Sequence, residues 1–237
     1  EMEKHAYHET REMTWSNVAL KYGKLFERYL EIEHEEIPAL PKINTTHLLR
    51  MTDSFGIIQF ANQSMPSQIS GYTLDDNARA LLVAAKHYEA LREFKYLNLV
   101  KIYLKYIKYV QAANGLLYNL VDAKKKVNVD SWSEDAHGRA LWALGYICSC
   151  ENLPVDFKTE AEDIFLKGLK AEMDSPRAVS FMITGLYHYN STRKSDKVKK
   201  KIVKLADYLV SLYKSSAHPE LKWFESYLTY ANSKLPE

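Results

Sequence analysis

The sequence predicts an all-α protein, an α/α toroid of helical hairpins in which inner helices alternate with outer ones. Two observations lead to this prediction. Glycine and proline are scarce, with 8 and 7 among 237 residues, so the chain lacks the tight turns that a β-sandwich or barrel needs every ten or so positions. Apolar residues also recur at helical spacing, and segments that are apolar on every side alternate with segments that keep one polar face.

The overall charge balance is close to neutral. Hydrophobic residues make up 46% of the chain and charged residues 26%, and the net charge is +2. These values are typical of a globular protein and give no electrostatic case for nucleic acid or an anionic membrane as a partner. Lysines cluster at Lys124 to Lys126 and at Lys197 to Lys204, and we interpret both clusters as solvated outer faces. No stretch approaches the ~20 apolar residues of a membrane span.

Cysteines and known sequence motifs give little sign of other chemistry. Cys148 and Cys150 lie two positions apart on a predicted helix, where their side chains point in different directions and do not pair easily. A reduced, cytoplasmic protein is therefore expected. The sequence contains no CxxC or HExxH pattern, no glycine-rich phosphate loop and no Gly-x-Ser-x-Gly elbow, so we expect no metal and no cofactor. Single histidines such as His137 are interpreted as packed or exposed side chains.

The N-terminal part of the chain is expected to be separate from the rest. Residues 14–34 place apolar side chains on one stripe of a long amphipathic helix. Pro38 and Pro41 then break the helical pattern. The expected divisions are a terminal segment, a linker and a helical domain, at residues 1–34, 35–43 and 44–237.

A short helix and a long loop open the helical domain. The helix is expected from His47 to Met51, with Asn44 or Thr45 as its cap. Residues 55–72 are not expected to be helical, because glycines and a proline interrupt them. Long loops in compact domains are commonly functional.

Regular pairs of helices follow. Segments that are apolar nearly all round are expected to be helices at residues 77–91, 136–148 and 177–189. Each is followed by a helix with one polar, solvent-exposed face, at residues 94–113, 157–172 and 195–213. A helix that is apolar on every side must be covered on every side, so the first kind forms an inner layer and the second an outer layer. A fourth inner helix is expected to begin at Trp223, which gives about four hairpins.

The spacing of the hairpins favours a toroid over a solenoid. Their period is irregular, roughly forty to sixty residues, whereas solenoids usually keep a tighter period. The longest loops precede the inner helices, and Asn114-Gly115 predicts a small β-hairpin in one of them. In a toroid, the N-termini of the inner helices converge on one end of the ring.

Two inner helices begin with the same pattern, an aspartate followed four positions later by Arg-Ala-Leu. The pairs are Asp75 with Arg79 and Asp135 with Arg139. An aspartate near a helix N-terminus caps the helix, and an i,i+4 pair lies on one face. This structural explanation is adequate for the first aspartate of each pattern.

A second acid beside each first one is not explained by capping. Asp76 follows Asp75, and Glu134 precedes Asp135. An aromatic residue also stands three positions before each first aspartate, Tyr72 or Trp132. Carboxylates with aromatic rings are common in sugar sites, where acids bind hydroxyls or act as acid and base and rings stack on the sugar.

Several motifs together carry a family resemblance. The longest are TDSFGIIQFA at residues 52–61, GYTLDDNARAL at 71–81, and WSED at 132–135 with GRALW at 138–142. SPRA at 175–178, and WFE at 223–225 with LTY at 228–230, continue the match. Together they resemble the helical domain at the C-terminus of certain bacterial nucleotide-sugar glycosyltransferases. Residues 13–30 resemble the last helix of a GT-B glycosyltransferase domain.

The resemblance implies a six-hairpin toroid related in shape to glycosidases and sugar epimerases, with the ring incomplete in this chain. It also implies a glycan or sugar as substrate, and a glycosyltransferase domain in the same chain or as a partner. One departure affects the site: Ala231 stands where the family pattern has an aspartate.

The sequence thus supports the hypothesis of a carbohydrate-processing or carbohydrate-binding domain associated with a glycosyltransferase. If the domain is catalytic, acid–base chemistry is assigned to carboxylates from the starts of the inner helices: Asp75, Asp76, Glu134, Asp135 and Glu225. Substrate binding is assigned to aromatic, amide and arginine side chains near them: Tyr72, Asn77, Arg79, Trp132, Arg139 and Trp223.

Two alternatives remain open. The first is a non-catalytic helical scaffold or interaction module that supports a glycosyltransferase, in which the acids are caps and arginine partners. The second, a terpenoid-type α/α barrel, is suggested only by the Asp75-Asp76 pair. A catalytic site requires Asp76, Glu134 and Glu225 to line one concave pocket, whereas acids on separate surfaces and already paired with arginines would argue against catalysis.

Overall fold

The computed structural model describes residues 15–30, 43–219 and 221–237. These residues belong to two units: the first contains α2 (Trp15–Leu30), and the second runs from Thr45 to Leu235. Of the predicted linker, only Ile43 is among the described residues. Residues 1–14 and 31–34 of the predicted terminal segment also lie outside them.

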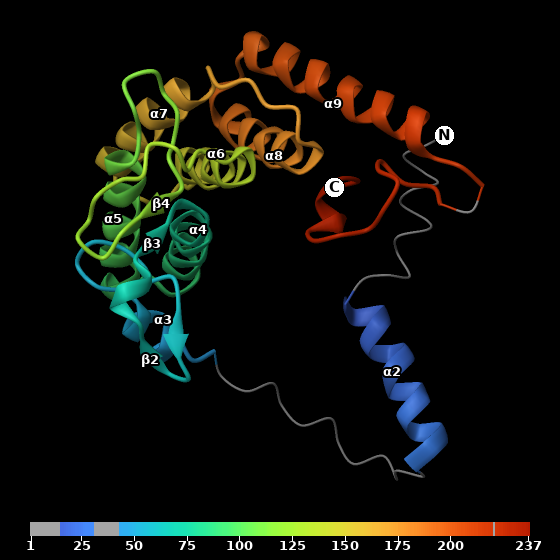
Figure 1. The fold of residues 1–237 in the computed structure, drawn as a ribbon, viewed down its shortest axis with the longest axis horizontal. Coiled ribbons are helices and arrows are strands. Elements are labelled where there is room, and N and C mark those ends of the chain that lie inside the picture. The colour runs from blue at the N-terminus through green and yellow to red at the C-terminus, as the bar shows by residue number, and fades with distance from the viewer. Residues whose placement is uncertain (1–14, 31–42, 220) are drawn as a thin grey trace. The chain divides into compact units, whose positions relative to one another are not determined.

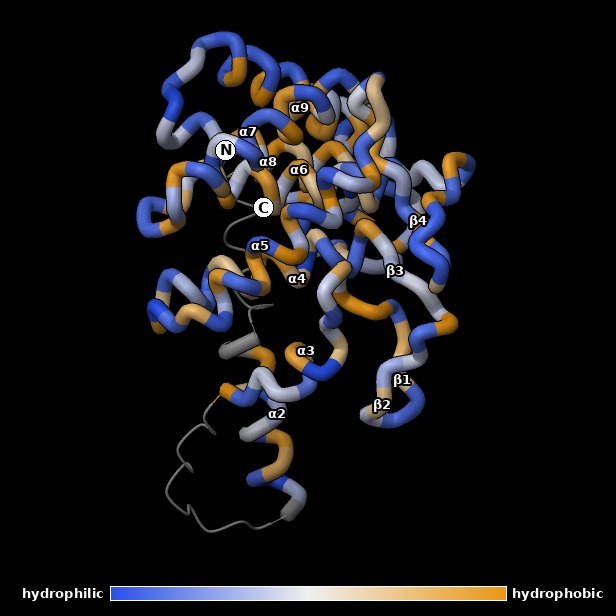
Figure 2. The backbone as a smooth tube through the Cα atoms, turned by 90° about the vertical axis from the view of Figure 1, so that its left-hand side faces the viewer, coloured by the Kyte–Doolittle hydropathy of each residue, from blue (hydrophilic) through white to orange (hydrophobic). Residues whose placement is uncertain are grey.

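Helix α2 is amphipathic, as the sequence predicts. Hydrophobic and hydrophilic stretches alternate along it (Figure 2). Its large apolar side chains are exposed in the described structure: Leu20, Tyr22, Leu25, Phe26 and Tyr29.

The second unit is mostly helical (Figure 1). Its helices are α3 (Thr46–Met51), α4 (Leu74–Leu91), α5 (Phe94–Tyr109), α6 (Glu134–Ser149), α7 (Val155–Gly168), α8 (Pro176–Arg193) and α9 (Asp196–Ser216). Short strands and 3-10 turns lie in the loops: β1 (Ala61–Asn62), β2 (Met65–Pro66), η1 (Gln68–Ser70), β3 (Tyr72–Thr73), β4 (Leu120–Val121) and η2 (Asn232–Lys234). None of the helices in the described part of the chain is long and apolar enough to span a membrane.

The long helices form two layers. α4, α6 and α8 pack side by side as the inner layer, and each is followed by an outer helix, α5, α7 or α9. Apolar side chains at the centre of the inner helices are completely buried, among them Leu81, Leu141 and Phe181. The predicted alternation of inner and outer helices is confirmed, since only all-round apolar helices tolerate burial on all sides.

Side-chain caps set the starts of several helices. Thr73 Oγ1 accepts a hydrogen bond from the Asp76 backbone N–H, and Ser133 Oγ does the same for Ala136. A cap satisfies a backbone donor that has no partner within the helix. α4 and α6 therefore start slightly earlier than the apolar pattern indicates.

Glycines bring the backbones of α6 and α8 together. A Cβ on Gly145 would overlap the backbone of Gly185, and a Cβ on Gly185 would overlap that of Leu141. A Cβ on Gly138 would meet Ala178 in the same way. These two helices make the most extensive contact in the unit, so the glycines fix the spacing of the inner layer.

The loops before α4 and α6 are joined by a small sheet. β3 pairs antiparallel with β4, with Tyr72 opposite Val121. The expected hairpin at Asn114-Gly115 is closed by one isolated β-bridge, between Gln111 and Leu117. The longer strand pairing in this loop is that of β4 with β3. The two loops in front of neighbouring inner helices are therefore held together.

The prediction of a fourth inner helix is wrong. Residues 221–231 form no regular helix, and only η2 follows them. The Tyr230 carbonyl accepts a hydrogen bond from Arg177, and Asn232 exchanges two hydrogen bonds with Thr229. Such side-chain bonds compete with helical ones. The described residues therefore contain three complete hairpins rather than about four.

Replacing Gly145 with alanine is expected to destabilise the second unit by about 2 to 4 kcal/mol, because the added methyl group overlaps rigid backbone. The free energy of unfolding in urea measures this. The matched control is Gly23→Ala in α2, where no atom of the described residues lies within 4 Å of the added carbon, so the unfolding of the second unit should not change. A loss at Gly145 below about 1 kcal/mol would contradict the close approach of α6 and α8.

Candidate functional site

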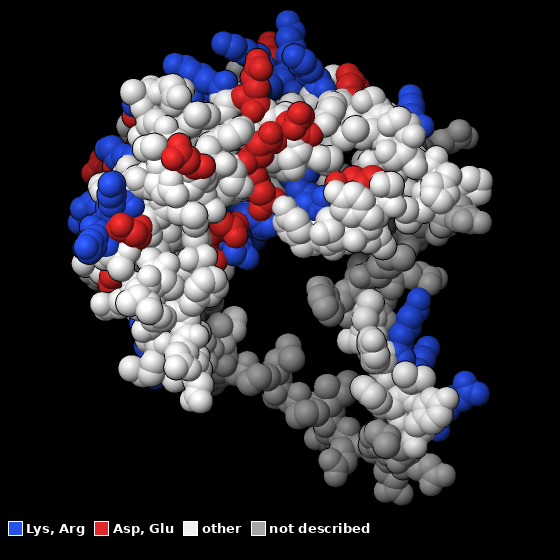
Figure 3. Space-filling view, viewed as in Figure 1, with Lys and Arg blue, Asp and Glu red and all other residues white. Residues whose placement is uncertain are grey.

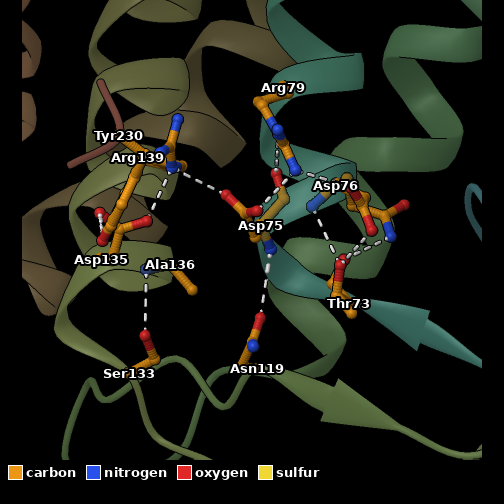
Figure 4. Close-up of polar contacts among 11 residues, drawn as sticks. Thr73, Asp75, Asp76, Arg79, Asn119, Ser133, Asp135, Ala136, Arg139 and Tyr230 are labelled. Carbon is orange, nitrogen blue, oxygen red and sulfur yellow. Dashed lines mark hydrogen bonds and ion pairs between the residues drawn. The ribbon is translucent and has the colours of Figure 1, made fainter. Parts of the chain in front are cut away.

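The N-terminal ends of α4, α6 and α8 lie at the same end of the second unit, because each inner helix is followed by an outer helix that runs back. The two Asp-x-x-x-Arg patterns therefore come together (Figure 4). Acidic and basic side chains lie next to one another over these helices in Figure 3.

Arg139 links the two patterns. Its Nε lies 2.8 Å from Asp135 Oδ2, on its own helix, and 2.8 Å from Asp75 Oδ1, on α4. The single Nε hydrogen is donated to Asp135, so Asp75 Oδ1 faces the positive charge without receiving that hydrogen. The Arg139 side chain is only 12% exposed, and its guanidinium lies 4.3 Å from the centre of the Phe181 ring.

Asp75 lies between two arginines. Its Oδ2 accepts a hydrogen bond of 2.6 Å from Arg79, and its backbone N–H donates to Asn119 Oδ1. Burial raises the pKa of the Asp75 carboxyl and outweighs the opposite effect of Arg139 and Arg79.

Asp76 belongs to the cap of α4. Its Oδ2 accepts a hydrogen bond from the Thr73 hydroxyl, and its Oδ1 lies 2.8 Å from Arg79. The second acid of this motif therefore has two partners within the chain.

The network continues to the C-terminal segment. The Tyr230 hydroxyl donates to Asp135 Oδ1 over 3.0 Å. Arg177, at the start of α8, donates to the Tyr230 carbonyl, stacks on the Tyr230 ring and lies 2.6 Å from Glu225 Oε2. We call this connected set the carboxylate–arginine network; its members are Asp75, Asp76, Arg79, Asp135, Arg139, Arg177, Glu225 and Tyr230.

Arg177 and Tyr230 were not among the residues assigned from the sequence. A signal for Arg177 exists, because it occupies the position of Arg79 and Arg139 in the third inner helix. The residue four positions before it is Met173, so its carboxylate partner comes from elsewhere in the chain. Tyr230 carries no comparable local signal.

Glu134 ties two inner helices together through the backbone. Its Oε2 accepts hydrogen bonds from the N–H groups of Asp174 and Ser175, at 2.9 and 2.7 Å. These groups lie just before α8. The Glu134 carboxylate thus satisfies donors at the positive end of a neighbouring helix.

Tyr72 and Asn77 both have partners within the chain. The buried Tyr72 donates from its hydroxyl to Asp53 Oδ2. The fully buried Asn77 accepts from the Ile57 N–H and donates to the Thr73 carbonyl. Their polar groups hold the long loop in front of α4.

Trp132 and Trp223 differ from these two residues. Both are partly exposed, yet each indole Nε1 is covered and has no acceptor. In the described part of the chain, five buried side-chain atoms lack a hydrogen-bond partner: Asp75 Oδ1, Tyr106 OH, Trp132 Nε1, Trp223 Nε1 and Glu225 Oε2. Four of them belong to residues that the sequence assigns to the site. Buried polar groups are rarely left without a partner.

The arrangement does not resemble a metal site. Across residues 15–30, 43–219 and 221–237, no three histidine, cysteine, aspartate or glutamate side chains are placed to hold an ion. Asp75 and Asp135, on different helices, have an arginine between them. The carboxylates are thus arranged for hydrogen bonding and charge neutralisation.

Comparisons with known proteins show the fold. No protein-family model and no curated protein matches the sequence significantly. The three hairpins of the described residues match part of a six-hairpin α/α toroid, the fold of two epimerase structures. A sugar epimerase from a ruminal bacterium superposes with a TM-score of 0.58 at 12% identity, over 70% of this chain and 51% of that one. Cellobiose 2-epimerase from Bacillus thermoamylovorans gives 0.59 at 14%, over 77% and 57%.

A polysaccharide lyase also superposes, with a TM-score of 0.50 at 18% identity, over 73% of this chain and 60% of the lyase. The chain therefore spans just over half the length of these three structures. At these identities the similarity is one of fold.

Replacing Arg139 with methionine is expected to cost about 3 kcal/mol of unfolding free energy, because it leaves Asp75 and Asp135 partly buried without their shared cation. Arg79→Met is the matched control: the Arg79 side chain is 51% exposed, so its loss should cost less than about 1 kcal/mol. Urea denaturation measures both. Equal losses for the two variants would show that Arg139 has no special place in the network.

Proposed function

We propose that the second unit is a carbohydrate-binding domain whose ligand binds at the N-terminal ends of α4, α6 and α8. The observation that carries this proposal is a group of covered polar atoms that make no hydrogen bond. Two are indole donors, on Trp132 and Trp223, and two are carboxylate oxygens of Asp75 and Glu225 that are held by ion pairs with arginines. The sequence assigns the same four residues to a sugar site.

The atoms without a hydrogen bond match the chemistry of hydroxyl groups. Asp75 Oδ1 and Glu225 Oε2 are acceptors, whereas the two indole Nε1 atoms are donors. A hydroxyl both donates and accepts, so a polyol satisfies both kinds. The atoms are covered in the free protein, so binding must be accompanied by movement of the side chains that cover them.

Binding is favoured over acid–base catalysis because the acids have partners. Asp76 is paired with Arg79, Glu225 with Arg177, and Glu134 accepts two backbone N–H groups. A general acid or base must exchange a proton with the substrate. Carboxylates held in this way serve better as fixed acceptors.

The comparisons support a sugar ligand. The similar structures are named as a sugar epimerase, a cellobiose 2-epimerase and a polysaccharide lyase. One fold can carry different chemistry, so these names support a sugar ligand without specifying a reaction. The association with a glycosyltransferase is supported only by the sequence resemblance, including that of residues 13–30 to the last helix of a GT-B domain.

A non-catalytic scaffold that supports a glycosyltransferase is the second candidate. The pairing of the acids with arginines favours it, because these contacts stabilise the inner helices without any ligand. On this alternative the unpaired indole donors have no role.

The proposal predicts that the chain binds a glycan on an array, and that saturation-transfer NMR detects the contact in solution. Trp132→Ala and Trp223→Ala should each weaken binding of the best array ligand by about tenfold, since each removes a ring and a donor.

The control is Phe60→Ala, which removes an exposed aromatic ring outside the network and should leave the affinity unchanged. Glu134→Gln keeps an oxygen to accept the two N–H groups and should bind normally. No binding to any glycan would favour the scaffold. Equal losses in the tryptophan and Phe60 variants would place the ligand elsewhere.

A further inference from the structure

The start of α9 carries a strong local positive charge. Lys194 precedes the helix, and four more exposed lysines lie in its first turns. Asp196 is the only acid between Lys194 and Lys204. These five lysines, the half-buried Lys201 and the one aspartate give the segment a charge of +5. We call the five lysines the α9 lysine stripe: Lys194, Lys197, Lys199, Lys200 and Lys204.

The stripe is electrostatically unfavourable for the isolated chain. Lysines in the first turns of a helix face the positive end of its dipole. Lys197, Lys200 and Lys204 also follow one another at spacings of three and four residues, at which like charges repel. Among the described residues, no ion pair is found for any lysine of the stripe. An anionic partner would relieve this repulsion.

The stripe faces away from the core. Val198 and Leu209 are the buried residues of α9, and the helix packs on α8. Lys197, Lys200 and Lys204 lie on the other side, as their spacing and exposure show. Basic side chains gather at the top of Figure 3, over the first half of α9. The near-neutral total charge of the chain therefore conceals a concentrated basic surface.

We propose that the α9 lysine stripe binds the surface of an anionic lipid bilayer. Lys197, Lys200 and Lys204 follow one side of the helix, which suits a flat surface with many phosphates better than a groove that follows a nucleic-acid strand. The stripe contains no aromatic ring for base stacking and no arginine for bidentate recognition of a base. Val203 is the only exposed large apolar residue between these lysines, so binding is electrostatic adsorption without insertion.

The position of the stripe leaves the candidate sugar site free. α9 starts where α8 ends, so the stripe lies at the end of the layer opposite to the N-termini of the inner helices. A membrane bound through the stripe would not cover the carboxylate–arginine network. The inference does not depend on the proposed carbohydrate ligand.

The test is co-sedimentation of the full 237-residue chain with phosphatidylcholine vesicles that either contain about 30% phosphatidylserine or lack it. We expect binding only to the anionic vesicles, and its loss in about 0.5 M salt, where charges are screened. The triple variant Lys197→Gln, Lys200→Gln, Lys204→Gln should bind about 100-fold more weakly, since each lysine near such a surface contributes about fivefold.

The matched control replaces three exposed lysines elsewhere, Lys101, Lys105 and Lys124, by glutamine. It has the same net charge as the stripe variant and should bind like the wild type. Failure of the wild type to bind anionic vesicles would overturn the proposal, as would equal losses in the two variants. Tighter binding to a single-stranded DNA oligonucleotide than to the vesicles would also overturn it.

Discussion

Arg139 makes the inner helices depend on one another. It offers one Nε hydrogen and one positive charge to two carboxylates, Asp75 on α4 and Asp135 on α6. Without that charge, two partly buried acids would face each other at neutral pH. Asp135 in turn holds Tyr230, which rests on Arg177. One guanidinium thus joins two helix starts to the C-terminal segment, and the surface proposed to bind a sugar exists because these ends are held together.

The local sequence pattern predicted most of the helices and the two i,i+4 ion pairs of this network, Asp75 with Arg79 and Asp135 with Arg139. The alternation of all-round and one-sided apolar segments gave the two layers, because burial follows directly from which faces are apolar. The i,i+4 spacing also identified the pairs within each helix. It could not show that Arg139 also faces Asp75, since that contact depends on how close α4 and α6 pack. Trp223 and Glu225 were expected on a helix, but Arg177 and neighbouring side chains hold their segment in an irregular form.

The two charged surfaces of the second unit differ in how their charge is balanced. In the carboxylate–arginine network, acids and arginines alternate and neutralise one another within a few ångströms. In the α9 lysine stripe, positive charges stand together with Asp196 as the one acid among them. Nearly balanced charges with unused hydrogen-bonding atoms fit a neutral polyol, whereas unbalanced charge fits an anionic surface. The two proposals therefore rest on opposite electrostatic features of one helical scaffold.

The most direct test of the shared arginine is a double-mutant cycle with Asp75→Asn and Asp135→Asn, followed by urea denaturation. Either acid alone can partner Arg139, and the two acids repel each other. We therefore expect the double variant to lose more unfolding free energy than the sum of the single losses, by about 1 kcal/mol or more. Losses that add within about 0.5 kcal/mol would show that the two carboxylates do not share Arg139 and would contradict the account.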